Sequence, residues 1–191
     1  MGKFELDFIK LASFKCYHFT KIQPRFAPAI MTDSKSPELI TIEKTQQTNA
    51  QMLDASHWGE DFSWEQLQVI GHYFKPYAAS DGTLIYKEGE LGTSMGIIVK
   101  GSIAIYKNDR LISTLRVGRT FGEMSVIDAQ PRSATARADG ETIFLSLDKA
   151  SLLTLANKNP ALAFKIIWNI SRALSQRLRL TSGRLVEFLE F

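Results

Sequence analysis

The chain has 191 residues, of which 45% are hydrophobic and 23% charged, and its formal net charge at pH 7 is +3. This length allows one domain of about 120 to 130 residues plus extensions, which is enough to bury a core. The single cysteine, Cys16, excludes an intramolecular disulfide, and Cys16 with nearby His18 makes too few ligands to predict a metal site. No apolar run approaches the ~18 residues of a membrane span, so a cytoplasmic protein without a span is expected.

Residues 1–60 carry the weakest pattern and are expected to form a partly disordered N-terminal extension. Within them, residues 32–49 are rich in Ser, Thr, Gln and Lys, a composition typical of a linker. Met31 opens a polar stretch that resembles a start of translation, and one hypothesis is that translation begins there. The competing hypothesis is that residues 1–30 dock onto a partner or fold against the domain.

A first helix is predicted to begin at Ser63. Ser63 can cap the free N–H groups while Gln66 reaches back to complete a capping box. Three apolar residues follow at a spacing that buries one face of the helix: Leu67, Ile70 and Phe74. Pro76 is expected to end this helix.

Short apolar runs separated by glycine follow the helix and indicate at least six strands. The runs cover residues 84–86, 96–99, 103–106, 111–115, 134–138 and 142–147. Asn108 and Asp109 lie between two of these runs and suit a hairpin turn. Strands at this spacing predict a sandwich or a rolled barrel, followed by a short helix at residues 152–155.

The last predicted helix begins near Pro160, a residue that is favourable at a helix start, and runs toward Phe191. One set of its positions alternates steps of four and three, as in a coiled-coil seam: Ile167, Ser171, Leu174, Leu178, Thr181, Leu185 and Phe188. Gly183 costs about 1 kcal/mol relative to alanine, so a frayed or kinked helix is expected beyond Ser182. Either this helix joins two copies of the chain, or it packs on its own barrel.

Residues 121–136, Phe-Gly-Glu-Met-Ser-Val-Ile-Asp-Ala-Gln-Pro-Arg-Ser-Ala-Thr-Ala, are the most informative stretch. Gly122 lets the backbone approach a ligand, and the amides after it can open a helical turn that cradles an anion. Pro131 ends the turn and leads into Arg132, whose planar guanidinium can grip two oxygens of one phosphate. Glu123 would be repelled by a phosphate and is expected to accept a hydrogen bond from a neutral hydroxyl. The alternative is that Glu123 and Arg132 pair in a loop that binds nothing.

This stretch resembles the phosphate-binding cassette of the cyclic nucleotide-binding domain family, which includes catabolite activators and the regulatory subunits of protein kinase A. The resemblance continues through Tyr-Lys-Glu-Gly-Glu-Leu-Gly at 86–92 and Met-Gly-Ile-Ile-Val-Lys-Gly-Ser-Ile-Ala-Ile at 95–105. It implies a mainly β fold: a jelly-roll-like β-roll at residues 61–159, with an N-terminal helix and a long C-terminal helix at 160–191. That last helix would serve as hinge, lid and possible dimerisation element.

The resemblance also implies a site for a cyclic nucleotide. Its phosphate and ribose would contact Gly122, Glu123, Met124, Ser125, Arg132, Ser133 and Ala134. Among these, Glu123 would take the ribose 2′-hydroxyl and Arg132 would neutralise the phosphate. Ile112 and Ser113 are the expected base wall, and Trp168 is a candidate to cap the base, although core packing is the stronger expectation for it. The expected ligand is either cyclic AMP or cyclic GMP, and cyclic AMP is favoured.

The implied function is that of a sensor that signals by moving its C-terminal helix, and the effector protein cannot be read from the residues. Nothing after the cassette is typical of a helix-turn-helix, so no DNA-binding element is predicted. Catalysis and cofactors are not predicted, because all three histidines, His18, His57 and His72, precede the roll strands and no catalytic arrangement stands out. The alternative function is a degenerate fold that serves as a dimerisation or docking scaffold without ligand.

Overall fold

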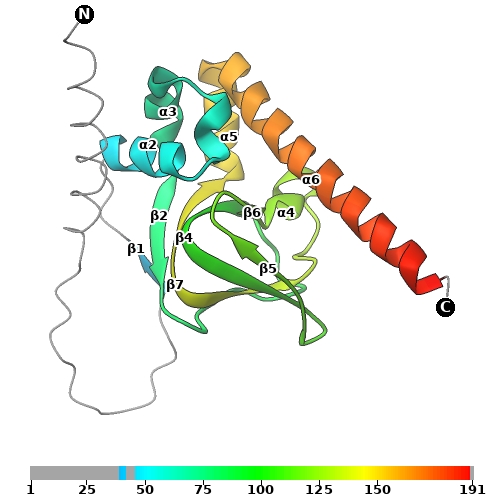
Figure 1. Ribbon diagram of the computed structural model, residues 1–191. Helices are drawn as coiled ribbons and strands as arrows, with labels where there is room; N and C mark the ends of the chain where they lie inside the picture. Colours follow the sequence, from blue (N-terminus) through cyan, green and yellow to red (C-terminus); the bar gives the residue numbers. More distant parts are fainter. Residues whose placement is uncertain (1–38, 42–45, 190–191) are drawn as a thin grey trace, which may run out of the picture. The chain divides into compact units, whose positions relative to one another are not determined.

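The described part of the chain is an antiparallel sheet with helices gathered at one end (Figure 1). The computed structural model describes residues 39–41 and 46–189, which belong to a unit that runs from Lys35 to Phe191. The predictions for residues 1–38, including Met31, Cys16 and His18, lie outside the described residues. No helix in the described residues is long and apolar enough to cross a membrane.

Seven strands form the sheet in the order β1-β2-β7-β4-β5, while β3 pairs with β7 and β6 pairs with β4. Their bounds are Leu39–Thr41 (β1), Lys75–Ala79 (β2), Leu84–Tyr86 (β3), Ser94–Lys107 (β4), Arg110–Arg116 (β5), Thr120–Phe121 (β6) and Thr135–Asp148 (β7). All the pairings are antiparallel, and the sheet curls into an unclosed roll. The mainly β fold with flanking helices is therefore confirmed.

The two longest strands, β4 and β7, pair over most of their length and bend together. At Gly101 of β4, φ is +77° and a Cβ would lie 2.4 Å from the Glu141 carbonyl oxygen, so this position requires glycine. The register between the strands shifts between Ile98 and Lys100 and again between Lys100 and Ser102, as expected for bulges that curve a sheet. The predicted hairpin turn is confirmed, because both Asn108 and Asp109 between β4 and β5 have positive φ.

The described residues also form six helical segments: α2 (Gln46–Ala55), the 3-10 helix η1 (Trp58–Asp61), α3 (Trp64–Gly71), α4 (Glu123–Asp128), α5 (Lys149–Lys158) and α6 (Pro160–Leu189). One core lies where α2, η1, α3, α5 and α6 meet one end of the sheet, and it contains Leu53, Phe74 and Leu147. A second core fills the interior of the roll around Phe121 and Phe144, whose rings meet edge to face with centroids 5.3 Å apart.

Helix α2 corrects the expectation that residues up to 60 form an extension with a linker at 32–49. Ala50 and Leu53 are fully buried, and the Asn49 side-chain amide donates to the carbonyl oxygens of Gly71 and Phe74, each at 2.9 Å. The helix is an integral part of the core. The buried face of α2 could not be predicted from its sequence, because one of the buried positions is an asparagine, which interrupts the apolar periodicity.

The prediction for α3 is confirmed at its start and corrected at its end. The Gln66 N–H donates to Ser63 Oγ at 3.3 Å and the Ser63 N–H donates to Gln66 Oε1 at 3.2 Å, which completes the capping box. Leu67, Ile70 and Phe74 are buried as predicted. The helix ends at Gly71, and Pro76 instead lies within strand β2.

Helix α6 is continuous over 30 residues, so the break expected at Gly183 is absent. Of the predicted seam, Ile167 and Leu174 are partly buried against the helical core, whereas the side chains of Leu178 and Leu185 are 68% and 59% exposed. In Figure 1 the second half of α6 extends clear of the roll. The first half of the seam therefore serves the chain's own core, and the second half is left uncovered within the described unit.

Asp148, at the end of β7, links the roll to α5 and should contribute to stability in a pH-dependent way. Burial acts to raise the pKa of Asp148, but hydrogen bonds from Ser151 and Lys75 outweigh it and hold the pKa below its ordinary value. A lowered carboxyl pKa gives stability that is fully present above the unfolded-state pKa of about 3.9 and is lost as pH falls through the folded-state pKa. Asp148→Asn should therefore lower the melting temperature at pH 7 and flatten its fall below pH 4. A melting series from pH 7 to pH 2.5 tests this, and parallel curves for both proteins would contradict it.

Candidate ligand-binding site

The site is built around the turn at Gly122, between β6 and α4. Gly122 has φ +71°, and a Cβ on it would lie 2.5 Å from Arg132 Nη1, so both the backbone and the packing require glycine. The predicted helical turn is confirmed as α4, which begins at Glu123. The turn ends at Asp128, followed by Ala129 in the left-handed region, so it stops before Pro131.

Arg132 lies behind this turn and is only 6% exposed. Its Nη1 donates to the Gly122 carbonyl oxygen at 2.7 Å and to Ser125 Oγ at 2.8 Å, and its Nη2 reaches Ser94 Oγ at 3.4 Å. None of the ion pairs formed among the described residues involves Arg132. Burial lowers the pKa of Arg132 below its ordinary value. The guanidinium is therefore a buried positive charge held by neutral acceptors, an arrangement that favours binding of an anion.

Glu123 lies on the other side of the turn and is 2% exposed. Its Oε1 accepts a hydrogen bond from Arg177 of α6, and its Oε2 is buried with no hydrogen-bond partner among the described residues. Arg177 also donates to the carbonyl oxygen of Thr120 and to Thr120 Oγ1, the latter at 3.1 Å. The carboxylate thus pairs with the terminal helix, and the alternative pairing of Glu123 with Arg132 is not observed.

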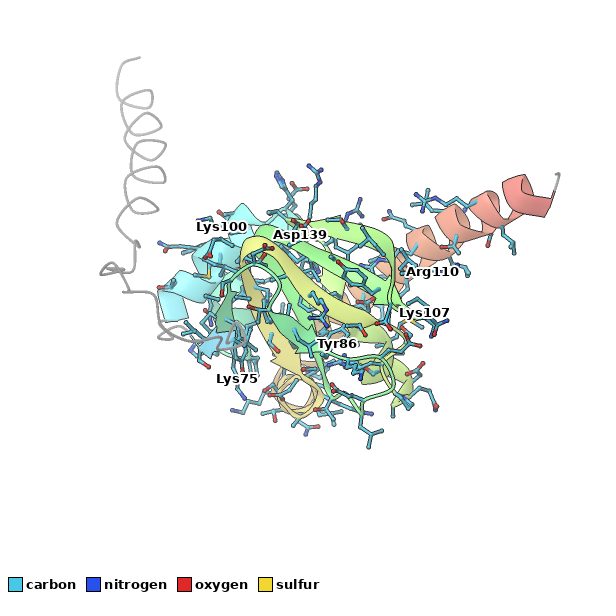
Figure 2. The ribbon with its side chains drawn as sticks, turned by 90° about the horizontal axis from the view of Figure 1, so that it is seen from below. Lys75, Tyr86, Lys100, Lys107, Arg110 and Asp139 are labelled. Atoms are coloured by element: carbon cyan, nitrogen blue, oxygen red, sulfur yellow. The ribbon has the colours of Figure 1, made fainter. Side chains whose placement is uncertain are left out.

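The other predicted cassette residues lie close by but differ in exposure. Ser125 is buried and its hydroxyl donates to the Gly122 carbonyl oxygen at 3.2 Å. Met124 and Ser133 are exposed, with Ser133 Oγ 3.5 Å from Met124 Sδ, and Ala134 is half-buried. The β4–β5 hairpin contacts the end of the cassette, because Lys107 Nζ donates to the Ser133 carbonyl oxygen at 2.8 Å (Figure 2 labels Lys107).

The structure leaves the predicted base wall apart from these groups. Ile112 and Ser113 lie in β5 and are exposed, and the described contacts join neither of them to the cassette. Trp168, the candidate base cap, is 60% exposed and stacks on Phe164 of the same helix, so the expectation that it packs in the core is wrong. The role of the base wall stays a prediction.

Of two hollows in the described part of the chain that we compared, the larger one is away from the cassette. It measures about 470 Å³ and lies between α3 and the start of α6, bordered by Val69, Leu162 and Lys165. The smaller one, about 140 Å³, lies inside the roll against Arg132 and Tyr86. The candidate ligand site is the smaller hollow with the adjoining turn, because there a buried guanidinium has no carboxylate partner and Glu123 Oε2 has no hydrogen-bond partner among the described residues. Its volume is below the roughly 300 Å³ of ordinary ligand pockets, so it can hold part of a nucleotide but not enclose one.

Sequence reasoning missed Arg177, which is the residue that joins the site to α6. It lies among several basic residues in the second half of the helix, and nothing in their spacing marks one of them. No group of three or more His, Cys, Asp or Glu side chains that could hold a metal ion occurs among the described residues. A curled sheet with a glycine-led helical turn, a buried guanidinium and a buried carboxylate is the arrangement expected of a site for a small anionic ligand.

Comparison with known proteins agrees with this class. The family model described as "Cyclic nucleotide-binding domain" matches residues 78–159. The cyclic AMP receptor protein of Thermus thermophilus is 29% identical over 120 residues, covering 60% of this chain and 54% of that protein. The cGMP-dependent protein kinase of Plasmodium berghei is 27% identical over 133 residues, covering 68% of this chain and 15% of that protein. A solved cyclic nucleotide-binding domain from Methylobacillus flagellatus superposes with a TM-score of 0.71 at 25% identity, covering 78% of this chain and 88% of that one.

Residues 78–159 therefore form a domain that matches the cyclic nucleotide-binding domain family. The chain spans about half of the Thermus protein and a much smaller part of the Plasmodium kinase. The family resemblance inferred from residues 121–136 is thereby confirmed.

Proposed function

We propose that this domain is a cyclic nucleotide sensor and that its site lies around the Gly122 turn. The observation that carries the proposal is a pair of buried groups: the Arg132 guanidinium, which no carboxylate pairs with among the described residues, and Glu123 Oε2, which has no hydrogen-bond partner there. One lacks an anion and the other lacks a hydrogen-bond donor. The phosphate of a cyclic nucleotide supplies the first and a ribose hydroxyl supplies the second. The amides of Glu123, Met124 and Ser125 add donors for the phosphate.

Cyclic AMP is the proposed ligand, ahead of cyclic GMP. The relatives do not separate the two, since one is named a cyclic AMP receptor and another a cGMP-dependent kinase. The exposed hydroxyl of Ser133 could contact a phosphate or a guanine amino group. The proposed activity is binding without catalysis, and neither a cofactor nor a metal is part of it.

Repositioning of α6 is the proposed signal, and Arg177 is the proposed link. A ligand shifts a conformational equilibrium only through different affinities for the two conformations. Arg177 binds one oxygen of Glu123 and would share that carboxylate with the ribose hydroxyl. Two further contacts hold the first half of the helix: Lys165 donates to Gln66 Oε1 at 3.0 Å, and Arg172 pairs with Asp61. Of these three contacts, the one at Arg177 alone reaches the site.

Arg177→Ala is therefore expected to uncouple α6 from the site. Hydrogen exchange of the amides in residues 170–185 should rise in the free protein, and cyclic AMP should change it less than in the wild type. Arg179→Ala is the matched control, because Arg179 is an exposed arginine two residues along the same helix. Equal exchange in the two variants would contradict the proposed link.

A second copy of the chain is the proposed partner of the uncovered part of α6, within residues 160–191. Leu178 and Leu185 are exposed there. A helical segment as short as this uncovered end of α6 is marginally stable in water without tertiary contacts, so a partner would stabilise it. The effector protein is not identified by these residues, and a cytoplasmic location is proposed with the rest of the sensor.

Calorimetric titration with cyclic AMP and cyclic GMP, with 5′-AMP as a control, tests the function. We expect saturable binding of cyclic AMP with one site per chain and weaker binding of 5′-AMP, which lacks the cyclic ester. Absence of binding by every cyclic nucleotide would favour the alternative, a degenerate fold that acts as a dimerisation or docking scaffold.

A further inference from the structure

Tyr86, in β3, contacts the buried guanidinium directly. The Arg132 Cζ atom lies 4.1 Å from the centroid of the Tyr86 ring, well within the range of a cation–π contact. The ring is itself fixed, because it stacks on Phe121 with centroids 6.1 Å apart (Figure 2 labels Tyr86). Burial raises the pKa of Tyr86 to about 12, so the ring presents a neutral phenol to the arginine at physiological pH.

Two glycines complete a socket around the same group. A Cβ on Gly92 would lie 2.1 Å from Arg132 Nε, and a Cβ on Gly122 would lie 2.5 Å from Arg132 Nη1. The socket, defined here as Tyr86, Gly92 and Gly122, therefore restricts the guanidinium on the Nε and Nη1 sides and across one face. The hydrogen bonds from Nη1 to the Gly122 carbonyl oxygen and to Ser125 Oγ then fix its rotation.

We propose that Tyr86 is a positioning residue that holds Arg132 ready for the phosphate, an inference that rests on the proposed function. An arginine side chain loses considerable rotamer entropy when it is fixed by a ligand, and a side chain that is fixed beforehand avoids that loss on binding. The ring also compensates the buried charge while no anion is bound. Tyr86 thus acts on the ligand through Arg132 and needs no contact of its own with the nucleotide.

Two substitutions distinguish the contribution of the Tyr86 ring from that of its hydroxyl group. Tyr86→Phe keeps the aromatic face and should bind cyclic AMP like the wild type. Tyr86→Leu removes the face and should weaken cyclic AMP binding by about 3- to 10-fold, the effect of one side chain that must be ordered on binding. Equal affinities of the leucine variant and the phenylalanine variant would overturn the proposal.

A double-mutant cycle without ligand tests the contact itself. Tyr86→Leu is introduced into the wild type and into Arg132→Met, and the four melting temperatures are compared. If the Tyr86 ring stabilises the guanidinium, Tyr86→Leu should lower the melting temperature by about 2 to 4 °C less in Arg132→Met than in the wild type. If Tyr86→Leu lowers the melting temperature equally in the wild type and in Arg132→Met, the proposed stabilising contact is contradicted. If the wild type binds no cyclic nucleotide, the proposed function and the role of Tyr86 in binding both fail, while this cycle still decides whether Tyr86 stabilises Arg132.

Discussion

Replacing Arg132 with methionine is expected to weaken cyclic AMP binding by about 2 to 5 kcal/mol. The free energy of unfolding is expected to stay close to that of the wild type or to rise. The loss of affinity is the range for removing one partner of a buried charge pair. Stability should be retained because the free protein pays a desolvation cost for a guanidinium that no carboxylate pairs with in the described residues, and methionine removes that cost. Titration calorimetry measures the first effect and urea unfolding measures the second.

Arg137→Ala is the matched control for this experiment. Arg137 lies in β7, five residues further along the chain, and is exposed. It should change neither affinity nor stability by more than the ~0.5 kcal/mol typical of surface substitutions. An Arg132→Met protein with unchanged affinity for cyclic AMP would contradict the assignment of the phosphate site.

Replacing Glu123 with glutamine is expected to have the second largest effect, on both stability and ligand discrimination. The substitution keeps the size of the side chain but leaves Arg177 without its carboxylate. We expect a loss of about 2 kcal/mol, below the ~3 to 5 kcal/mol for a fully buried pair, because the Arg177 side chain is 32% exposed and partly screened by solvent. Urea unfolding measures this loss.

The discrimination is measured by comparing cyclic AMP with its 2′-deoxy analogue. A hydrogen bond to a charged group contributes about 1.5 to 3 kcal/mol, so the wild type should bind the deoxy analogue roughly 10- to 150-fold more weakly. Glu123→Gln should narrow this ratio, because the amide is a weaker acceptor. Glu141→Gln, at an exposed position, should keep the wild-type ratio. An unchanged ratio in the Glu123 variant would show that the carboxylate does not contact the ribose.

The parts of the fold that could be predicted are those with strong local signals. The six glycine-punctuated apolar runs coincide with four strands, β3, β4, β5 and β7, whereas β1, β2 and β6 were not predicted. Ser63 with Gln66 predicted the start of α3. The positive φ of Asn108 and Asp109 agrees with the predicted turn. Each of these features depends on residues that are close in sequence.

The parts that were missed depend on contacts between distant residues. Helix α2 was read as linker because its buried Asn49 is satisfied by carbonyl groups 22 and 25 residues away. The pairing of Glu123 with Arg177 joins residues 54 apart, and nothing in either local sequence indicates it. The contact of Tyr86 with Arg132 likewise requires β3 and the loop before β7 to be brought together by the roll. Gly183 shows the opposite case, in which a local penalty of about 1 kcal/mol does not interrupt a long helix.

The melting temperature of the wild-type chain with and without saturating cyclic AMP tests the central claim most directly. At 100 times the dissociation constant, a ligand that binds only the folded state adds about 2.7 kcal/mol to the free energy of unfolding. For a domain of this size that corresponds to a rise of roughly 5 to 10 °C. We expect such a rise for the wild type, and a rise of no more than about 3 °C for Arg132→Met at the same concentration of cyclic AMP. A melting temperature that stays unchanged with cyclic AMP and with cyclic GMP would contradict a nucleotide site at the Gly122 turn.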